Sequence, residues 1–334
     1  MSIPKIVHII WVGGKSPITS ATGLKSNLAR IINWKEKLTG WEVILWTETE
    51  RALTGPAFNT LIENKIKVQD ISSVLKDFEE PWSQFVHDEL FGSQANFGAA
   101  SDILRVAILV KFGGLYTDLD NFPGTNINSM NTLASSQDLY VGLYENPAVF
   151  CNAVLAAKKG SQFMKDYMAE IVNEYRRMYS PSLADIESMP ILSPLKEKIK
   201  ESYNSFKKVG NEKYTNRLLD ALTNFNIIYH RKIDRLNTTI NMTGPRILRW
   251  CIERHFFNYS DDYVEYIKSY KDYEVFTTQA NKLKDNYIPI DVIKITSENS
   301  WGGKDNLDLL IDQANKDLEK LVDNITSDWL NDVD

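Results

Sequence analysis

The chain has 334 residues, of which 43% are hydrophobic and 25% charged, and its formal net charge is −6. This composition indicates a folded protein, either one large α/β domain or a core domain with a helical annex. The acidic balance argues against a nucleic-acid partner, because backbone binding requires a concentrated basic surface. Two cysteines, Cys151 and Cys251, are too few for a disulfide framework and indicate a reduced compartment.

The first apolar run covers residues 6–12 and is followed by Gly13 and Gly14. It is too short to span a membrane and lacks the cleavage pattern of a signal peptide. Its β-branched residues predict a buried central strand with a ligand beyond its carboxyl end. A helix over 24–38 and a strand over 41–46 complete a βαβ unit.

The next part of the chain leads to an amphipathic helix and a double glycine. The aromatic stretch over 71–92 is interpreted as a helical insertion packed on the core. An amphipathic helix over 94–111 is predicted to place Asp102 and Arg105 on one side, away from its apolar stripe. The elements predicted around them are a helix over 57–64, a strand over 65–69, a helix end at 113–114 and a strand over 115–119.

Two carboxylates, Asp118 and Asp120, follow this last strand. Alternate side chains share one face of a strand, so Tyr116, Asp118 and Asp120 are predicted to point together. Oxygen ligands of this kind suit Mn²⁺ or Mg²⁺, which bridges the phosphates of a nucleotide sugar and stabilises the leaving diphosphate. Acidic pairs at this spacing are also common in surface turns, but the double glycine and apolar strand before them favour a ligand site.

The second half of the sequence is mainly helical. Its charged runs over 196–200 and 207–213 are interpreted as solvated helix faces. Thr243 is predicted as a cap and Pro245 as an early position of one helix. The predicted elements are strands over 139–144 and 149–157, helices over 161–222, a strand over 225–230, a strand over 288–295 and a helix over 305–330. No window is apolar enough for a membrane-spanning helix.

Several stretches together resemble the Asp-x-Asp glycosyltransferases of the large clostridial glucosylating toxins and their bacterial effector relatives. They are residues 8–14, 100–105, 113–120 and 123–124. The resemblance implies an α/β fold of the GT-A (Rossmann-like) type, with a mixed, mainly parallel sheet and an added helical subdomain. It also implies a UDP-sugar donor, Mn²⁺ (or Mg²⁺) and retention of the anomeric configuration. The domain expected is a single one over 1–334, with a core over 1–160 and 225–304, a helical insertion over 161–224 and a terminal helix over 305–334.

The resemblance also implies roles for individual residues. Carried over by position, Trp11 stacks on the uracil, Asp102 and Arg105 hold the donor sugar and ribose, Tyr116 lines the nucleotide pocket, Asp118 contacts ribose and sugar, and Asp120 ligates the metal. In a loop near the C-terminus, Glu298 completes the metal coordination, while Ser300 and Trp301 contact the β-phosphate. From the residues alone, Trp11 and Trp301 fit ordinary packing equally well, and Asp102 with Arg105 fits an intrahelical ion pair.

The donor sugar is suggested by the segment around Asn152, which resembles the family strand whose Asn contacts the sugar. Bulky neighbours at that strand go with UDP-glucose and small ones with UDP-N-acetylglucosamine (UDP-GlcNAc). Cys151 and Ala153 are small, which favours UDP-GlcNAc. Small residues also suit a buried strand packed under a helix.

The function expected from the resemblance is transfer of N-acetylglucosamine to a hydroxyl of a host protein, with a small Rho-type GTPase as acceptor. The protein would then be a secreted or translocated bacterial effector acting in the host cytosol, without a standard N-terminal signal. The early first strand suggests a domain of a larger toxin. The alternatives are a glycosyltransferase of bacterial surface polysaccharide or glycolipid, UDP-glucose as donor, and an inactive module that binds a nucleotide sugar.

Overall fold

The computed structural model describes residues 2–13, 18, 26–48, 56–78, 81–145, 148–263, 265–266, 283, 285–295 and 307–333, with the side chains of 144, 145, 148, 149 and 333 left aside. The chain forms two compact units. The first comprises Met1–Ile171 and Ile240–Ser300, and the second comprises Val172–Thr239 and Trp301–Asp334. Each unit has its own hydrophobic core.

A seven-stranded sheet forms the first unit, with the strand order β3-β2-β1-β4-β7-β6-β8. Its strands are β1 (Ile6–Ile10), β2 (Glu42–Thr47), β3 (Lys67–Asp70), β4 (Gly114–Thr117), β6 (Leu139–Glu145), β7 (Ala148–Ala157) and β8 (Tyr287–Ile288). The pairs β3-β2, β2-β1, β1-β4 and β6-β8 are parallel, whereas β7 is antiparallel to β4 and β6. The predicted mixed, mainly parallel sheet is therefore confirmed.

One predicted strand, over 288–295, is two short strands in the structure. β8 joins the large sheet, whereas β9 (Ile293–Lys294) pairs with β5 (Phe122–Pro123) in a separate two-stranded sheet. β8 and β9 are separated by a turn. In this turn the amides of Val292 and Ile293 both donate to the Pro289 carbonyl. Proline ends β8 because it has no amide to donate to a neighbouring strand.

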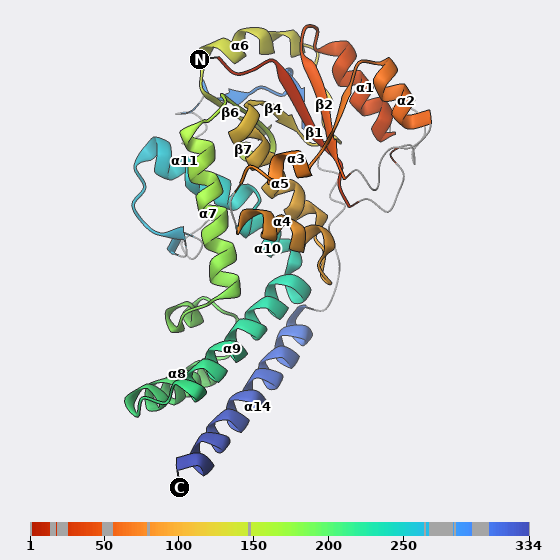
Figure 1. Cartoon of the computed structure of the whole chain (residues 1–334). Coiled ribbons are helices and arrows are strands. Elements are labelled where there is room, and N and C mark those ends of the chain that lie inside the picture. Colours follow the sequence, from red (N-terminus) through yellow and green to blue (C-terminus); the bar gives the residue numbers. More distant parts are fainter. Residues whose placement is uncertain are drawn as a thin grey trace. The chain divides into compact units, whose positions relative to one another are not determined.

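Helices surround the sheet of the first unit (Figure 1). They are α1 (Asn27–Lys37), α2 (Pro56–Glu63), α3 (Ser72–Leu75), α4 (Trp82–Phe91), α5 (Phe97–Phe112), η3 (Ile127–Ser129), α6 (Met130–Ser136) and α11 (Pro245–Phe257). Two more, α7 (Gln162–Tyr179) and α10 (Arg235–Met242), contain the boundaries between the units. The helical insertion predicted over 71–92 consists of α3 and α4, which pack against α5.

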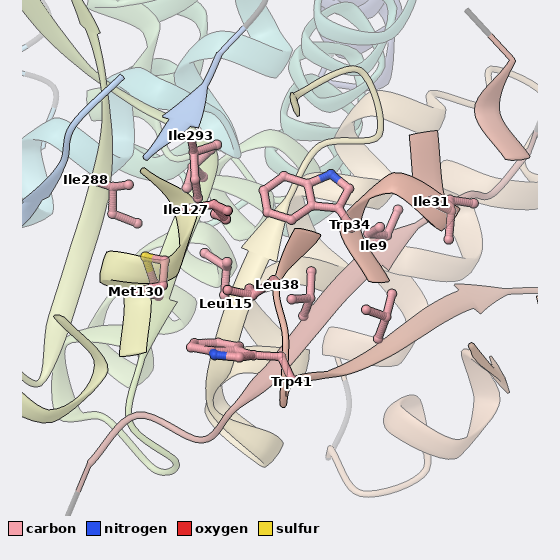
Figure 2. Packing of buried hydrophobic residues seen from close by; sticks show 14 of the residues in the cluster. Ile9, Ile31, Trp34, Leu38, Trp41, Leu115, Ile127, Met130, Ile288 and Ile293 are labelled. Atoms are coloured by element: carbon pink, nitrogen blue, oxygen red, sulfur yellow. The ribbon is translucent and has the colours of Figure 1, made fainter. Parts of the chain in front are cut away.

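The core of the first unit lies between α1 and one face of the sheet. Figure 2 shows Trp34 of α1 and Leu38, which directly follows α1, gathered with Ile9 and Leu115 of the strands into one buried cluster. Large apolar side chains of this kind each stabilise the fold by about 1.5–3 kcal/mol on burial. The opposite face of β1 carries His8, whose ring packs 6.1 Å from that of Phe112 in α5. The central strands are thus covered on both faces, which explains their continuous apolar runs.

Helix α5 is buried almost all round, so the expectation of an amphipathic helix is wrong. Residues 98–100 and 102–109 are all buried, and they include Asp102 and Arg105. The cause is that α5 packs against β1, β4 and β7 and also against α3 and α4. The charged side chains of Asp102 and Arg105 therefore lie inside the protein, where they require partners.

The turn from α5 to β4 requires glycine at two successive positions. Gly113 has φ +65°, and a Cβ there would lie 2.4 Å from the Lys159 amide nitrogen. Gly114 has φ +102°, and a Cβ there would lie 2.7 Å from the Ile6 carbonyl oxygen and 3.0 Å from His8 Nε2. A side chain at either position would therefore collide with neighbouring strands as well as strain the backbone.

His8 joins this turn to the sheet. Its Nε2 donates to the Gly113 carbonyl over 2.8 Å, and its Nδ1 accepts from Trp46 Nε1 over 3.0 Å. Burial lowers the pKa of His8 to about 4, although the bond to Gly113 acts in the opposite direction. The imidazole is therefore neutral at pH 7, with the proton on Nε2, and its role here is structural.

The second unit is helical. It contains η4 (Leu183–Glu187), α8 (Ser193–Lys208), α9 (Glu212–Ile228), a π-helical turn η5 (Tyr229–Ile233) and α14 (Leu307–Val333). The strand predicted over 225–230 is wrong, because α9 continues to Ile228 and η5 follows it. Leu218, Leu222 and Phe225 recur at helical spacing and pack into the core of this unit. A short apolar run does not by itself distinguish a strand from a buried helix.

The charged runs of the second unit are solvated helix faces, as predicted. Lys198 of α8 pairs with Asp323 of α14, and Lys213 and Arg217 of α9 pair with Asp332 and Asp328 of α14. All these side chains are substantially exposed, so the pairs are screened by solvent and contribute little to stability. Among the described residues, every helix is too short or too polar to cross a membrane.

Candidate active site

Arg105 is the centre of the candidate site. Its Nη2 lies 2.8 Å from Asp102 Oδ1 on the same helix and 3.2 Å from Asp118 Oδ1 beyond β4. Its Nη1 donates to the Asn152 carbonyl of β7, and its Cζ lies 4.4 Å from the centre of the Tyr116 ring. The intrahelical ion pair considered from the sequence exists, and the same guanidinium also contacts strands β4 and β7 and the turn after β4.

Burial sets the charge states in this cluster. Burial raises the pKa of Asp102 to about 6, while Arg105 acts to lower it. Burial also acts to lower the pKa of Arg105, but Asp118 and Asp102 outweigh it and hold that pKa above its ordinary value. Arg105 therefore keeps its positive charge at all accessible pH values, and Asp102 is mostly ionised at pH 7.

Asp118 and Asp120 lie in a turn and not in a strand, which corrects the expectation that they share a strand face with Tyr116. β4 ends at Thr117, and the amide of Asn121 donates to the Asp118 carbonyl over 3.2 Å. Asn121 is fully buried, and its Nδ2 donates to the Ala153 carbonyl over 3.1 Å, so it anchors the turn. Alternation of side chains therefore stops at Thr117.

Tyr116 and Asp118 nevertheless meet through a direct hydrogen bond. The Tyr116 hydroxyl donates to Asp118 Oδ1 over 2.6 Å, and it lies 3.3 Å from Ser101 Oγ. Asp118 is 33% exposed, whereas Arg105 and Asp102 beneath it are buried. Asp120 is partly exposed two residues further along the same turn. The turn thus presents two carboxylates at the carboxyl end of β4, where α/β sheets bind ligands.

A bulge in β7 completes the site. Val141 pairs with Leu155 but Gly142 pairs with Cys151, so residues 152–154 of β7 have no partners on β6. The side chain of Asn152 donates to Asp102 Oδ1 over 2.8 Å. The Ala153 carbonyl accepts from the Asp118 amide over 2.8 Å. The bulge therefore supplies both a side chain and two backbone carbonyls, a use of bulges that is common beside active sites.

Two further residues belong to this cluster, and the sequence did not indicate them as such. Thr243 Oγ1 donates to Asp102 Oδ2 over 2.9 Å, and the Tyr167 hydroxyl donates to the Thr243 carbonyl over 2.7 Å. Thr243 was predicted as a helix cap, but the N-cap of α11 is Gly244. The Thr-Gly-Pro helix start was the only signal near Thr243, and nothing in the sequence distinguishes Tyr167 from other core tyrosines.

The remaining predicted site residues are placed as follows. Trp11 comes directly after β1, where its amide donates to the Trp46 carbonyl over 2.9 Å. Its half-buried side chain packs against the core of the first unit, so the structure shows the packing contact considered for it. Glu298, Ser300 and Trp301 lie outside the described residues.

The donor set of this turn fits a hard divalent cation. Within the described part of the chain, no three His, Cys, Asp or Glu side chains form a metal-binding group. Mg²⁺ and related ions, however, are usually held by one or two protein carboxylates, with phosphate and water oxygens completing the coordination. Asp118 and Asp120 supply such carboxylates, so they suit a cation that binds together with a diphosphate.

Comparison with solved structures identifies the fold. The fold aligns with the catalytic domain of alpha-toxin from Clostridium novyi with a TM-score of 0.55 and 13% identity, over 96% of this chain and 83% of that chain. It also aligns with the UDP-bound glycosyltransferase domain of the YGT toxin, with a TM-score of 0.52 and 14% identity, over 90% of this chain and 82% of that chain. The chain therefore has the GT-A glycosyltransferase fold.

Sequence comparison identifies the family. A family model for the TcdA/TcdB catalytic glycosyltransferase domain matches residues 50–233, so the chain belongs to this family and is a glycosyltransferase. The match includes Asp102, Arg105, Asp118, Asp120 and Asn152. The toxin-type glycosyltransferase resemblance drawn from the sequence is thereby confirmed.

Two curated bacterial proteins are similar to parts of this chain. Subversion of eukaryotic traffic protein A of Legionella pneumophila is 27% identical over 181 residues, which are 52% of this chain and 26% of that protein. Toxin A of Clostridium novyi is 31% identical over 100 residues, which are 30% of this chain and 4% of that protein. The chain thus spans only a small part of the length of these relatives.

Proposed function

We propose that this chain is a retaining, metal-dependent glycosyltransferase that transfers N-acetylglucosamine from UDP-GlcNAc to a hydroxyl of a host protein. The observation that carries the proposal is the buried Arg105, which holds Asp102, Asp118 and the Asn152 carbonyl around one point. Family membership and the UDP-bound structural neighbour support a UDP-sugar as the donor.

The cluster is suited to a polyhydroxylated, phosphorylated donor. A planar guanidinium of fixed charge can donate to sugar and phosphate oxygens in defined directions. Asp102, held by several donors, accepts hydrogen bonds from the sugar hydroxyls, and Asp118, which is 33% exposed, contacts the ribose and sugar. Tyr116 lines the nucleotide pocket and Trp11 stacks on the uracil in this proposal.

The carboxylates of the site support a role for a divalent cation in this proposal. Asp102, Asp118 and Asp120 are acidic side chains that would repel an anionic diphosphate. Mn²⁺ or Mg²⁺ held by Asp120 and Asp118, with Glu298 as a further ligand, offsets this repulsion. Such an ion, if bound, would supply positive charge that favours departure of the diphosphate.

The preference for UDP-GlcNAc rests on small residues around Asn152. Cys151 and Ala153 are both buried beside it in β7, so larger side chains would have to take space next to the sugar-facing Asn152. Ala153→Val should lower activity with UDP-GlcNAc more than with UDP-glucose, measured as the ratio of kcat/KM values. Ala156→Val, on the same strand in the sheet core, is the matched control. An unchanged donor ratio in Ala153→Val would reject this part of the proposal.

The direct test is hydrolysis of the donor without an acceptor. We expect the full chain to hydrolyse UDP-GlcNAc in the presence of Mn²⁺, with little activity after chelation and less with UDP-glucose. Proton NMR of the first sugar released would show retention of the anomeric configuration. Tight UDP-GlcNAc binding with no hydrolysis under any metal condition would instead indicate an inactive binding module.

The acceptor is proposed to be a small Rho-type GTPase in the host cytosol, reached by a secreted or translocated effector. The names of the two curated relatives, a toxin and a subversion protein of eukaryotic traffic, support an action on host cells. Incubation of a eukaryotic lysate with the chain and radioactive donor, followed by mass spectrometry, would identify the labelled protein. Label found only in polysaccharide or glycolipid would contradict a protein acceptor.

A further inference from the structure

We infer that Thr243 and Tyr167 form a positioning pair that fixes the Asp102 carboxylate in the orientation that the donor sugar requires. The inference rests on the proposed role of Asp102 in holding the sugar. Neither residue was identified from the sequence as part of the donor site. Both are completely buried, and both lie in the first unit, together with Asp102.

The Asp102 carboxylate is held on both oxygens. Oδ1 accepts from Asn152 Nδ2 over 2.8 Å and lies 2.8 Å from Arg105 Nη2, while Oδ2 accepts from Thr243 Oγ1 over 2.9 Å. Arg105 and Asn152 both act on Oδ1, so Thr243 is the residue that sets the rotation of the carboxylate about its Cβ–Cγ bond. A rotated carboxylate would aim its lone pairs away from the sugar hydroxyls, and small misplacements of this kind lower turnover strongly.

Thr243 is itself fixed by Tyr167 of α7. The Tyr167 hydroxyl donates to the Thr243 carbonyl over 2.7 Å and is 3.2 Å from the Gly244 carbonyl. A threonine at the start of a helix commonly caps the first free amides of that helix. Here Gly244 is the N-cap without a side-chain bond, and the Thr243 hydroxyl turns to α5 instead. Hydrogen bonds thereby connect α7 to the loop before α11, and that loop to the Asp102 carboxylate.

A buried carboxylate needs hydrogen bonds even where it has no functional role, so a purely structural contact is the alternative to exclude. The two possibilities differ in what is lost with the Thr243 hydroxyl. A structural contact would affect folding and every ligand alike. A positioning contact affects the sugar part of the donor and leaves binding of UDP alone intact, because Asp102 acts on the sugar.

The test compares Thr243→Val with Thr243→Ser in the full chain, using Mn²⁺, UDP and UDP-GlcNAc. We expect Thr243→Val to lower kcat/KM for UDP-GlcNAc hydrolysis by about 10-fold or more, as for loss of a hydrogen bond to a charged group. The affinity for UDP, measured by calorimetry, should stay within about 2-fold. Thr243→Ser, which keeps the hydroxyl, should recover most of the wild-type kcat/KM.

Tyr167→Phe is a second variant, in case Thr243→Val does not fold, because it removes only a hydroxyl. It should lower hydrolysis in the same direction and by less, whereas Tyr175→Phe, a buried tyrosine of the same helix, should leave it unchanged. Wild-type activity in Thr243→Val, a parallel loss of UDP affinity, or failure of serine to restore activity would overturn the inference. A wild-type chain that binds UDP but hydrolyses no UDP-sugar would instead overturn the proposed function.

Discussion

Arg105 illustrates how much of the site depends on the shape of one side chain. Its planar guanidinium reaches Asp102, Asp118 and the Asn152 carbonyl at once, which the single ammonium of lysine cannot do. We therefore expect Arg105→Lys to lower kcat/KM for UDP-sugar hydrolysis by about 100-fold, the scale for breaking a buried charged pair. Arg254→Lys, an exposed arginine paired with Glu170, is the control and should be neutral.

Asp120 tests the metal assignment separately. Asp120→Asn removes the negative charge that a divalent cation requires while keeping the size of the side chain. We expect Mn²⁺-dependent UDP-sugar binding and hydrolysis to be lost while the fold is retained, as circular dichroism would show. Asp138→Asn, at an exposed carboxylate paired with Lys158, provides the matched comparison. Full activity in Asp120→Asn would contradict its role as a metal ligand.

Residue types and spacing could predict part of the site. Asp102, Arg105, Tyr116, Asp118 and Asn152 were all identified from short motifs, and the structure brings these five together. Thr243 could not be found in this way, because its bond to Asp102 joins residues 141 positions apart. Contacts of that kind depend on the path of the chain, which local patterns do not contain.

At the scale of elements, the double glycine between α5 and β4 has a measurable role. Gly113 and Gly40 both have positive φ, but a Cβ would meet the Lys159 amide only at Gly113, while Gly40 has open space. We expect Gly40→Ala to cost about 1 kcal/mol in the free energy of unfolding and Gly113→Ala at least about 3 kcal/mol. Denaturant unfolding of both variants measures the difference. Equal losses of stability in the two variants would show that position 113 requires glycine only because of its positive φ, and not because of the contact with Lys159.

His8 makes the same junction sensitive to acid. Its pKa is about 4 in the folded protein against 6.5 ordinarily, because burial disfavours the charged ring. Between these values the unfolded chain binds the proton and the folded chain does not, so stability present above pH 6.5 is lost as the pH falls. Between pH 7 and 4.5 we expect the wild type to lose about 2–3 kcal/mol more than His8→Gln.

The control for this pH series is Leu330→Ala, which changes no titratable group and lies at a 53% exposed position. That variant should show the pH dependence of the wild type. Denaturant unfolding at pH 7 and 4.5 is sufficient for the comparison. Identical pH dependence of His8→Gln and the wild type would contradict a neutral, buried His8.

Most elements could be predicted from hydrophobic periodicity, and the errors have identifiable causes. β1, α1, β2 and β7 were expected within a few residues of their observed bounds. The predicted helix ended too early, at 222, because the apolar run over 225–230 resembles a strand. In the structure the helical pattern continues into that run, and α9 ends at Ile228. The turn at Asp118 was missed because the buried Asn121 that anchors it reads in sequence as an ordinary polar residue.

At the scale of the whole molecule, the two units have separate cores, and a core substitution can be confined to one of them. Ile325 of α14 is buried in the core of the second unit, whereas Leu330 on the same helix is 53% exposed. We expect Ile325→Ala to lower the free energy of unfolding by about 2–5 kcal/mol and Leu330→Ala by less than about 0.5 kcal/mol.

The same pair of variants shows whether the donor site depends on the second unit. Because all described contacts of Arg105 lie in the first unit, UDP affinity at 25 °C should be equal in Ile325→Ala and Leu330→Ala. Calorimetric titration with UDP and Mn²⁺ measures it. A selective fall in Ile325→Ala would show that the first unit needs the second for binding.

The bulge in β7 has a consequence for how this site can change during evolution. Two of its contributions, the carbonyls of Asn152 and Ala153, are present whatever amino acid occupies those positions. A substitution at 153 would therefore leave Arg105 and Asp118 anchored, and under the proposed function it could change the fit of the donor. Deletion of one residue from this stretch would remove an anchor entirely. At position 153 the anchors thus depend on the length of the strand and not on the side chain.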